Sequence, residues 1–187
     1  GLVKGAAPII IAAHYDSTAN LEPKGTWNAS RDPAPGADDD GSGVVAVMEL
    51  ARLFTSPNYQ TDHPVWFVLF TGEEVGLTGS TAYANELRLS GQEVELMLSL
   101  DPIGFNPAQE YHLWFSYDQA SKESAETLDS LGLERGGPLL LHAVDQELFG
   151  GDDRSDHYPF WRNGYKALHI ANFPMSPYYH TMDDTAD

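Results

Sequence analysis

The sequence contains no cysteine, little positive charge and no long hydrophobic run. Without cysteine, the chain can form neither a disulfide scaffold nor a thiolate zinc site. Its 10 lysine and arginine residues stand against 28 aspartate and glutamate residues, and the resulting net charge of −18 disfavours binding to nucleic acid or anionic lipid. No run of about 18 apolar residues is present, so we expect neither a membrane-spanning helix nor a membrane or nucleic-acid partner.

The remaining features are those of one folded domain. The 187 residues are 42% hydrophobic, which is enough to bury a core. Short apolar runs alternate with segments of helical periodicity. Strands are expected at residues 8–14, 64–71, 93–101, 111–117, 138–144 and 165–171, and helices at residues 43–54, 77–89, 121–131 and 155–163. This alternation predicts an α/β three-layer sandwich with a mixed, largely parallel central sheet flanked by helices.

Four details of the pattern make separate predictions. The continuous apolar run at residues 64–71 indicates a central strand. Ser42 is predicted to cap the first helix, and Gly132 to stop the third. The long loop at residues 15–41 is expected to be functional, because loops of this length are uncommon in compact domains.

Acidic residues and histidines follow the predicted strands at the point where each strand ends. In parallel sheets such residues meet at one edge. They are His14, Asp16, Asp38, Asp39, Asp40, Glu73, Glu74, Asp101 and His180. Crowded carboxylates repel one another unless a cation neutralises them, and imidazole with carboxylate suits zinc. One zinc ion needs fewer ligands than this set provides, so the sequence favours a site with two metal ions.

Six blocks of sequence resemble those of a known family. They are AAHYDS, PGADDDGSG, FTGEEVGLTGS, LSLDPIG, RSDHYPF and YYHTMDDT, at residues 12–17, 35–43, 70–80, 98–104, 154–160 and 178–185. Their order and spacing resemble the co-catalytic di-zinc aminopeptidases of metallopeptidase clan MH, the group of bacterial leucyl aminopeptidase. Glutaminyl cyclase and glutamate carboxypeptidase are relatives of that group. The resemblance spans residues 8–185 and implies a zinc-exopeptidase-like fold.

The resemblance implies two Zn²⁺ ions and a ligand for each matching position. His14 and Asp101 would bind one ion. Glu74 and His180 would bind the other, and Asp39 would bridge both.

Other matching residues would support or carry out the chemistry. Glu73 would be the general base, taking a proton from a metal-bridging water and passing it to the leaving amine. Asp16 would orient the imidazole of His14 from the second shell of the site. Asp40 would also stand in that shell, joined to Asp39 by a cis peptide bond.

Two residues have both a catalytic and a purely structural interpretation. By resemblance, Tyr179 would stabilise the oxyanion of the tetrahedral intermediate, but it also fits a packed aromatic. Arg154 would contact the substrate, but it also fits a surface salt bridge. His157 is interpreted as structural, and no chemistry is assigned to the remaining histidines, which are His63, His112, His142 and His169.

The implied function is a zinc-dependent aminopeptidase that hydrolyses the N-terminal peptide bond of peptides. One metal ion would polarise the scissile carbonyl and the other would anchor the free α-amine. A related dinuclear carboxypeptidase or dipeptidase remains open, because the same ligands serve either end of a peptide. A single-zinc glutaminyl cyclase is disfavoured, since no insertion follows Glu74. A non-catalytic binding relative would be expected to have lost ligands.

Four further expectations concern the chain as a whole. Residues 1–187 resemble a single zinc-peptidase catalytic domain that is incomplete at both ends relative to the family. An uncovered sheet edge would then favour a homo-oligomer. The resemblance implies an extracellular or periplasmic location, without a signal peptide in the sequence. Phe149, Tyr158, Phe160 and Trp161 are candidate walls of an apolar pocket for the first side chain of the substrate, but core packing is the favoured interpretation of each.

Overall fold

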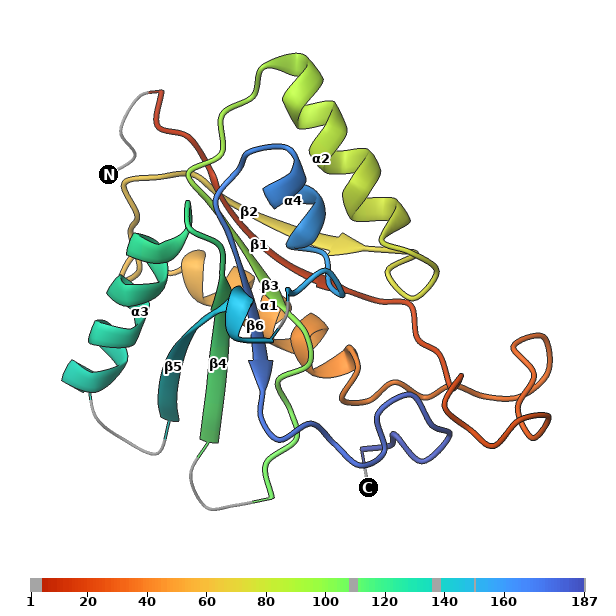
Figure 1. Ribbon diagram of the computed structural model, residues 1–187. Coiled ribbons are helices and arrows are strands. Elements are labelled where there is room, and N and C mark those ends of the chain that lie inside the picture. The colour runs from red at the N-terminus through yellow and green to blue at the C-terminus, as the bar shows by residue number, and fades with distance from the viewer. Residues whose placement is uncertain (1–4, 108–110, 136–138, 150, 187) are drawn as a thin grey trace.

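The computed structural model describes residues 5–107, 111–135, 139–149 and 151–186. Within them, six strands form one sheet in the order β2-β1-β3-β6-β4-β5 (Figure 1). The strands are β1 (Ile9–His14), β2 (Val65–Phe70), β3 (Leu96–Leu100), β4 (Tyr111–Tyr117), β5 (Leu139–Asp145) and β6 (Ala167–Asn172). All neighbouring pairs are parallel except β4 and β6, which are antiparallel. The predicted mixed, largely parallel sheet is confirmed.

Helices cover both faces of the sheet (Figure 1). They are α1 (Gly41–Phe54), α2 (Thr78–Ser90), α3 (Lys122–Arg135) and α4 (Tyr158–Arg162), with the short 3₁₀ helix η1 (Gln146–Phe149) after β5. Successive side chains of a strand point to opposite faces, so Ile10 and Ile11 of β1 serve different cores. Ile10 packs in the core under α2 and α4, and Ile11 packs in the core under α1 and α3. The fold therefore has three layers, as predicted.

The strand β2 lies at an edge of this sheet, and the prediction of a central position was wrong. Its apolar run has another cause. Trp66 and Val68 pack against the core beneath α2 and α4, while Val65 and Phe67 pack against the core beneath α1 and α3. Helices cover both faces of β2, so the side chains that point to either face are apolar. This holds although β2 pairs with only one described strand, β1.

The helix boundaries differ from the predicted ones in three places. Asp40, not Ser42, is the N-cap of α1, because its carboxylate accepts a hydrogen bond from the main-chain N–H of Gly43. Gly132 lies inside α3 and does not stop it. A Cβ atom at this position would lie 2.6 Å from the Leu141 side chain, so the glycine permits α3 to pack closely on β5. The last predicted helix is reduced to α4, and residues 155–157 precede it as a turn.

The long loop at residues 15–40 runs beside the C-terminal segment (Figure 1). The main-chain N–H of Leu21 donates to the carbonyl of His180, and that of Ala37 donates to the carbonyl of Asp184. Main-chain hydrogen bonds thus join two segments that are far apart in the sequence. None of the helices described by the structure is long and apolar enough to cross a membrane.

Candidate metal centre

The three adjacent strands β2, β1 and β3 bring several of the predicted site residues together. His14 is the last residue of β1, Asp101 directly follows β3, and Glu73 and Glu74 lie in the turn after β2. These strands are mutually parallel neighbours, so their carboxyl ends lie side by side. The topology therefore accounts for the convergence of residues that are far apart in the sequence.

A first cluster forms around the buried imidazole of His14. Its Nε2 atom lies 3.1 Å from Oδ1 of Asp39 and 3.3 Å from Oδ1 of Asp101. Its Nδ1 atom lies 2.9 Å from the main-chain oxygen of Asp16, which can only accept a hydrogen bond. Nδ1 therefore carries the hydrogen, and in a neutral ring Nε2 presents its lone pair to two carboxylates.

A second cluster repeats this arrangement around His180. Its Nε2 atom lies 2.8 Å from Oδ2 of Asp39 and 3.1 Å from Oε2 of Glu74. Its Nδ1 atom lies 3.2 Å from the amide oxygen of Asn20. As in the first cluster, Nδ1 donates to an oxygen atom and Nε2 faces two carboxylates.

The carboxylate of Asp39 belongs to both clusters, with one oxygen toward each histidine. Its main chain is fixed by the buried Asp184. The N–H of Asp39 donates to Oδ2 of Asp184 over 3.1 Å, and the N–H of Asp38 donates to Oδ1 over 2.9 Å. The bridging position that the resemblance implies for Asp39 is thus geometrically available.

Asp40 lies behind the first cluster. Its carboxylate accepts hydrogen bonds from the main-chain N–H groups of His14 and Gly43, at 3.0 and 3.1 Å. The Asp39–Asp40 peptide bond is cis, as the resemblance led us to expect. Asp40 therefore joins the start of α1 to the end of β1.

The two clusters fit a pair of cations. In each, a ring nitrogen and carboxylate oxygens point at one another within 4.8 Å, and all of these atoms are acceptors unless a proton or a cation stands between them. Burial lowers the pKa of both histidines, but hydrogen bonds to Asp101 and Asp39 raise that of His14 well above its usual range. Hydrogen bonds to Asp39 and Glu74 likewise raise the pKa of His180 to about 9. A set of imidazoles and carboxylates without sulfur suits zinc in place of these protons.

Asp16 connects the first cluster to the turn after β2. Its carboxylate accepts hydrogen bonds from the main-chain N–H groups of Glu73 and Glu74, both at 3.2 Å. It meets the His14 imidazole through its main-chain oxygen, while its carboxylate stays 3.8 Å from Nδ1. Burial, followed by the charge of Asp101, raises the pKa of the Glu73 carboxyl group to about 9 in the metal-free chain.

A cavity of about 190 Å³ adjoins the clusters. Asp101 and Tyr179 line it on the side of the candidate metal centre, and Arg154 also lines it. Burial, followed by the charge of Asp39, raises the pKa of Tyr179, so its hydroxyl stays protonated. The ring of Tyr179 stacks on that of His180, with centroids 3.7 Å apart.

The aromatic residues considered as candidate pocket walls do not form this cavity in the described part of the structure. Tyr158, Phe160 and Trp161 do not line it, and the side chain of Phe149 lies outside the described part of the structure. Phe160 is fully buried in the core beneath α2 and α4. The apolar lining comes instead from Pro102, Trp114, Val144, Ala171, Phe173 and Met175. Phe160 and Trp161 pack in or against the core beneath α2 and α4, as favoured from the sequence.

Sequence reasoning missed several residues of the site. Asn20, which contacts His180, lies in the long loop, where no sequence pattern marks it. Asp184, which holds the main chain of Asp39, lies in the block YYHTMDDT, but no role was predicted for it. Asp152 is hydrogen-bonded to His169, and His169 in turn contacts the main-chain oxygen of Asp101. His157, predicted to be structural, is fully buried and stacks on His169.

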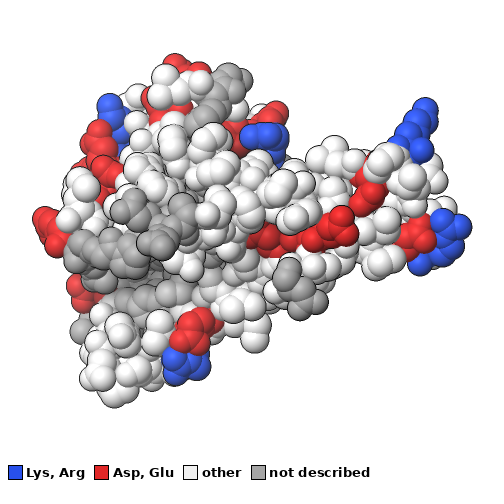
Figure 2. Space-filling model, turned by 90° about the horizontal axis from the view of Figure 1, so that it is seen from below, with Lys and Arg blue, Asp and Glu red and all other residues white. Residues whose placement is uncertain are grey.

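On the face seen from below in Figure 2, most of the described surface belongs to uncharged residues. One row of acidic side chains runs from the centre of this face toward the right, and lysine and arginine side chains are few and scattered. With a formal net charge of −18, the chain attracts cations and protonated amines.

The chain is similar to known aminopeptidases in sequence and in fold. A probable leucine aminopeptidase of Arthroderma benhamiae is 30% identical over 188 residues, covering 96% of this chain and 48% of that protein. An aminopeptidase from Aneurinibacillus sp. strain AM-1 superposes with a TM-score of 0.73 at 31% identity, covering 96% of this chain and 38% of the other. A zinc aminopeptidase from Bacillus subtilis superposes with a TM-score of 0.71 at 26% identity, covering 98% and 41%.

The chain spans less than half the length of each of these three proteins. The predicted resemblance to the zinc aminopeptidases is nevertheless confirmed across nearly the whole sequence. The model of peptidase family M28 matches residues 3–187, and the chain belongs to this family.

Proposed function

We propose that this chain is the catalytic part of a zinc aminopeptidase that holds two zinc ions. His14 and Asp101 would bind one ion, Glu74 and His180 the other, and Asp39 both. The observation that carries the proposal is the division of the Asp39 carboxylate between two histidines, with one oxygen 3.1 Å from His14 and the other 2.8 Å from His180. A carboxylate shared in this way suits a pair of ions about 3.5–4 Å apart.

The side chains around the clusters have distinct roles in this proposal. When bound, zinc lowers the pKa of a water molecule toward about 7 and polarises the carbonyl oxygen of the scissile bond. Glu73 accepts the proton of the attacking water and returns it to the leaving amine. Tyr179, whose hydroxyl stays protonated, donates a hydrogen bond to the oxygen of the tetrahedral intermediate. Arg154 contacts the substrate from the wall of the cavity.

We place the first side chain of the substrate in the 190 Å³ cavity. Trp114, Phe173 and Met175 give it an apolar lining, which favours leucine, methionine or phenylalanine at the first position of the peptide. The relatives named as aminopeptidases support a peptide with a free N-terminus as the substrate class.

The test is hydrolysis of leucine p-nitroanilide by the purified chain, measured after chelation and again after zinc is added back. N-acetyl-leucine p-nitroanilide is the control, because acetylation removes the free amine. We expect activity that chelation abolishes, that zinc restores and that acetylation blocks. Activity on the acetylated compound would exclude an aminopeptidase. Two bound zinc ions without activity on either compound, but with release of C-terminal residues from peptides, would favour the carboxypeptidase alternative.

The proposal includes an extracellular or periplasmic location and association between copies of the chain. The location is supported by the family resemblance and the strongly acidic composition. Association is supported by the edge strand β2, where Trp66 and Phe67 border a groove with Phe54 and Tyr59. Sedimentation equilibrium of the purified chain tests association, and a mass equal to one chain at micromolar concentration would overturn it.

A further inference from the structure

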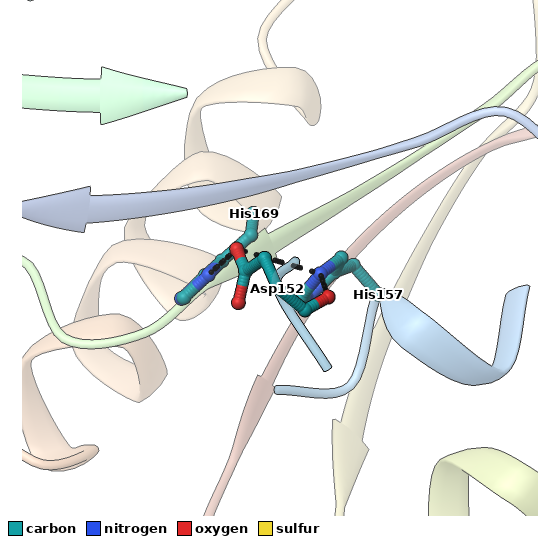
Figure 3. Close-up of side chains that lie close together, drawn as sticks. All are labelled: Asp152, His157 and His169. Carbon is teal, nitrogen blue, oxygen red and sulfur yellow. Dashed lines mark hydrogen bonds and ion pairs between the residues drawn. The ribbon is translucent and has the colours of Figure 1, made fainter. Parts of the chain in front are cut away.

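A second group of titratable side chains lies beside the candidate metal centre. It consists of Asp152, His157 and His169, whose nitrogen and oxygen atoms lie within 4.8 Å of one another (Figure 3). Asp152 and His157 are buried, and only about 15% of the His169 side chain is exposed. The roles assigned to the metal-centre residues leave this group unexplained.

The orientation of the two rings excludes a third metal ion at this place. The imidazoles of His157 and His169 stack with centroids 4.8 Å apart and planes inclined by 11°. An ion bound to an imidazole lies in the plane of that ring, along the nitrogen lone pair. Two nearly parallel planes in stacking contact cannot share one ion. In addition, Nε2 of His157 lies 3.1 Å from the main-chain oxygen of Asp152, so this nitrogen donates a hydrogen bond and offers no lone pair.

His169 instead bridges two oxygen atoms. Its Nδ1 atom lies 2.8 Å from Oδ2 of Asp152, and its Nε2 atom lies 2.7 Å from the main-chain oxygen of Asp101. A carboxylate and a carbonyl oxygen both accept hydrogen bonds, so His169 donates from both nitrogens and carries a positive charge opposite Asp152.

The contact with Asp101 completes the attachment of that residue to β6. The main-chain N–H of Asp101 donates to the carbonyl of Ile170 over 2.8 Å, and the carbonyl of Asp101 accepts from His169. Both sides of the Asp101 main chain are therefore held by consecutive residues of β6. The carboxylate of Asp101 then points at His14, with Oδ1 3.3 Å from Nε2.

We propose that His169, held by Asp152, is a positioning residue that fixes the main chain of Asp101 and so aims the Asp101 carboxylate at the metal shared with His14. The inference rests on the proposed zinc site. It predicts that the hydrogen bond from Nε2 of His169 to Asp101 sets zinc affinity most strongly, and that Asp152 contributes indirectly, by holding the imidazole ring with its Nε2 atom toward Asp101.

Two substitutions of His169 separate these bonds. The amide nitrogen of glutamine reaches the place of Nε2, so His169→Gln keeps a donor for the Asp101 carbonyl. The amide nitrogen of asparagine reaches the place of Nδ1, so His169→Asn keeps only the contact with Asp152. His142→Asn is the matched control, because His142 also lies on a strand of this sheet and stacks on His112, with centroids 5.2 Å apart.

The experiment is a zinc titration of the metal-free proteins against a chromophoric chelator, with melting temperatures recorded in parallel. We expect His169→Asn to weaken one of the two zinc sites about 10- to 100-fold, the range seen when partners behind metal ligands are removed. His169→Gln and His142→Asn should bind zinc within a few-fold of the wild-type chain. A purely structural His169 would lower the melting temperature of both His169 variants and leave their zinc affinities alike, which would overturn the proposal.

Asp152→Asn gives a second measure if His169→Asn does not fold. The side chain keeps its shape and one acceptor oxygen, but it no longer pairs a charged imidazole, so we expect several-fold weaker zinc binding. An unchanged affinity would overturn the proposal. A wild-type chain that binds no zinc would overturn the proposed function as well, whereas wild-type binding with no difference between the Asn and Gln variants would overturn only the role of His169.

Discussion

The Nε2 atom of His14 lies 3.1 Å from Oδ1 of Asp39, although one residue ends a strand and the other ends a long loop. Both atoms are acceptors when the imidazole is neutral, so a proton or a cation must stand between them. Asp101 adds a third acceptor at 3.3 Å from the same nitrogen. The carboxylates buried at this point repel one another, and a divalent cation bound between them would remove this repulsion and stabilise the folded chain.

The shared carboxylate makes Asp39→Asn the most informative change to metal content. Asparagine keeps the shape of aspartate but offers one oxygen, so it cannot bind both ions. We expect the variant to hold one zinc ion or none where the wild-type chain holds two. Atomic absorption of dialysed protein measures this. Asp38→Asn is the matched control, because the Asp38 side chain accepts hydrogen bonds from the main-chain N–H groups of Gly104 and Phe105 and faces neither histidine. If Asp39→Asn retained two zinc ions, Asp39 would not be the bridging ligand.

Glu73→Gln separates proton transfer from metal binding. Glutamine is isosteric but cannot accept and release a proton at neutral pH. Because general base catalysis contributes about 10²- to 10⁴-fold, we expect kcat for leucine p-nitroanilide to fall by that factor. The zinc content and KM should stay close to those of the wild-type chain. A variant with lost activity and lost zinc would show instead that Glu73 helps to hold the ions.

Asp156 should make the metal-free chain less stable as the pH rises. Burial raises the pKa of its carboxyl group from 3.8 to about 6. A carboxyl group with a raised pKa in the folded state favours folding below its unfolded pKa, and that contribution is lost as the pH rises through the folded value. The shift corresponds to about 3 kcal/mol.

Asp156→Asn should therefore become more stable relative to the wild-type chain between pH 4 and pH 7. Urea unfolding in the presence of a chelator measures the difference in unfolding free energy at each pH. A difference that stays constant across this range would show that folding does not raise the pKa of Asp156.

Gly43→Ala tests the close contact between α1 and the end of β3. A Cβ atom at Gly43 would overlap the main-chain oxygen of Leu100 and the carboxylate of Asp40, so the helix must shift. We expect a loss of about 1–3 kcal/mol in unfolding free energy, as for other overpacked sites. Gly91→Ala is a control without such a contact, although its positive φ of 71° adds some strain. A smaller loss for Gly43→Ala than for Gly91→Ala in urea unfolding would contradict the close contact.

Much of the fold could be predicted because the signals are local. The runs that became β1, β4 and β6 are short and rich in apolar residues, and alternation with helical periodicity indicates an α/β fold. The edge position of β2 could not be predicted in the same way. An apolar run reports that both faces of a strand are covered, and it carries no information about which strands pair with it.

The sequence by itself determined which chemical groups are available at the strand ends. His14, Glu74 and Asp101 follow predicted strands, and parallel strands end at one edge, so their convergence follows from the pattern alone. The absence of cysteine limited the donors to nitrogen and oxygen. The resemblance then added a role for each residue.

Only the tertiary structure decided which groups stand behind these residues. Side-chain hydrogen bonds between distant segments join Asn20 to His180, Asp184 to Asp39, and His169 to Asp101. Such bonds depend on distances of about 3 Å and on the direction of each donor, which no periodicity in a sequence encodes. The same reason explains why the apolar walls of the cavity could not be identified from the sequence, since side chains of equal hydrophobicity are sorted between core and pocket only by how the layers pack.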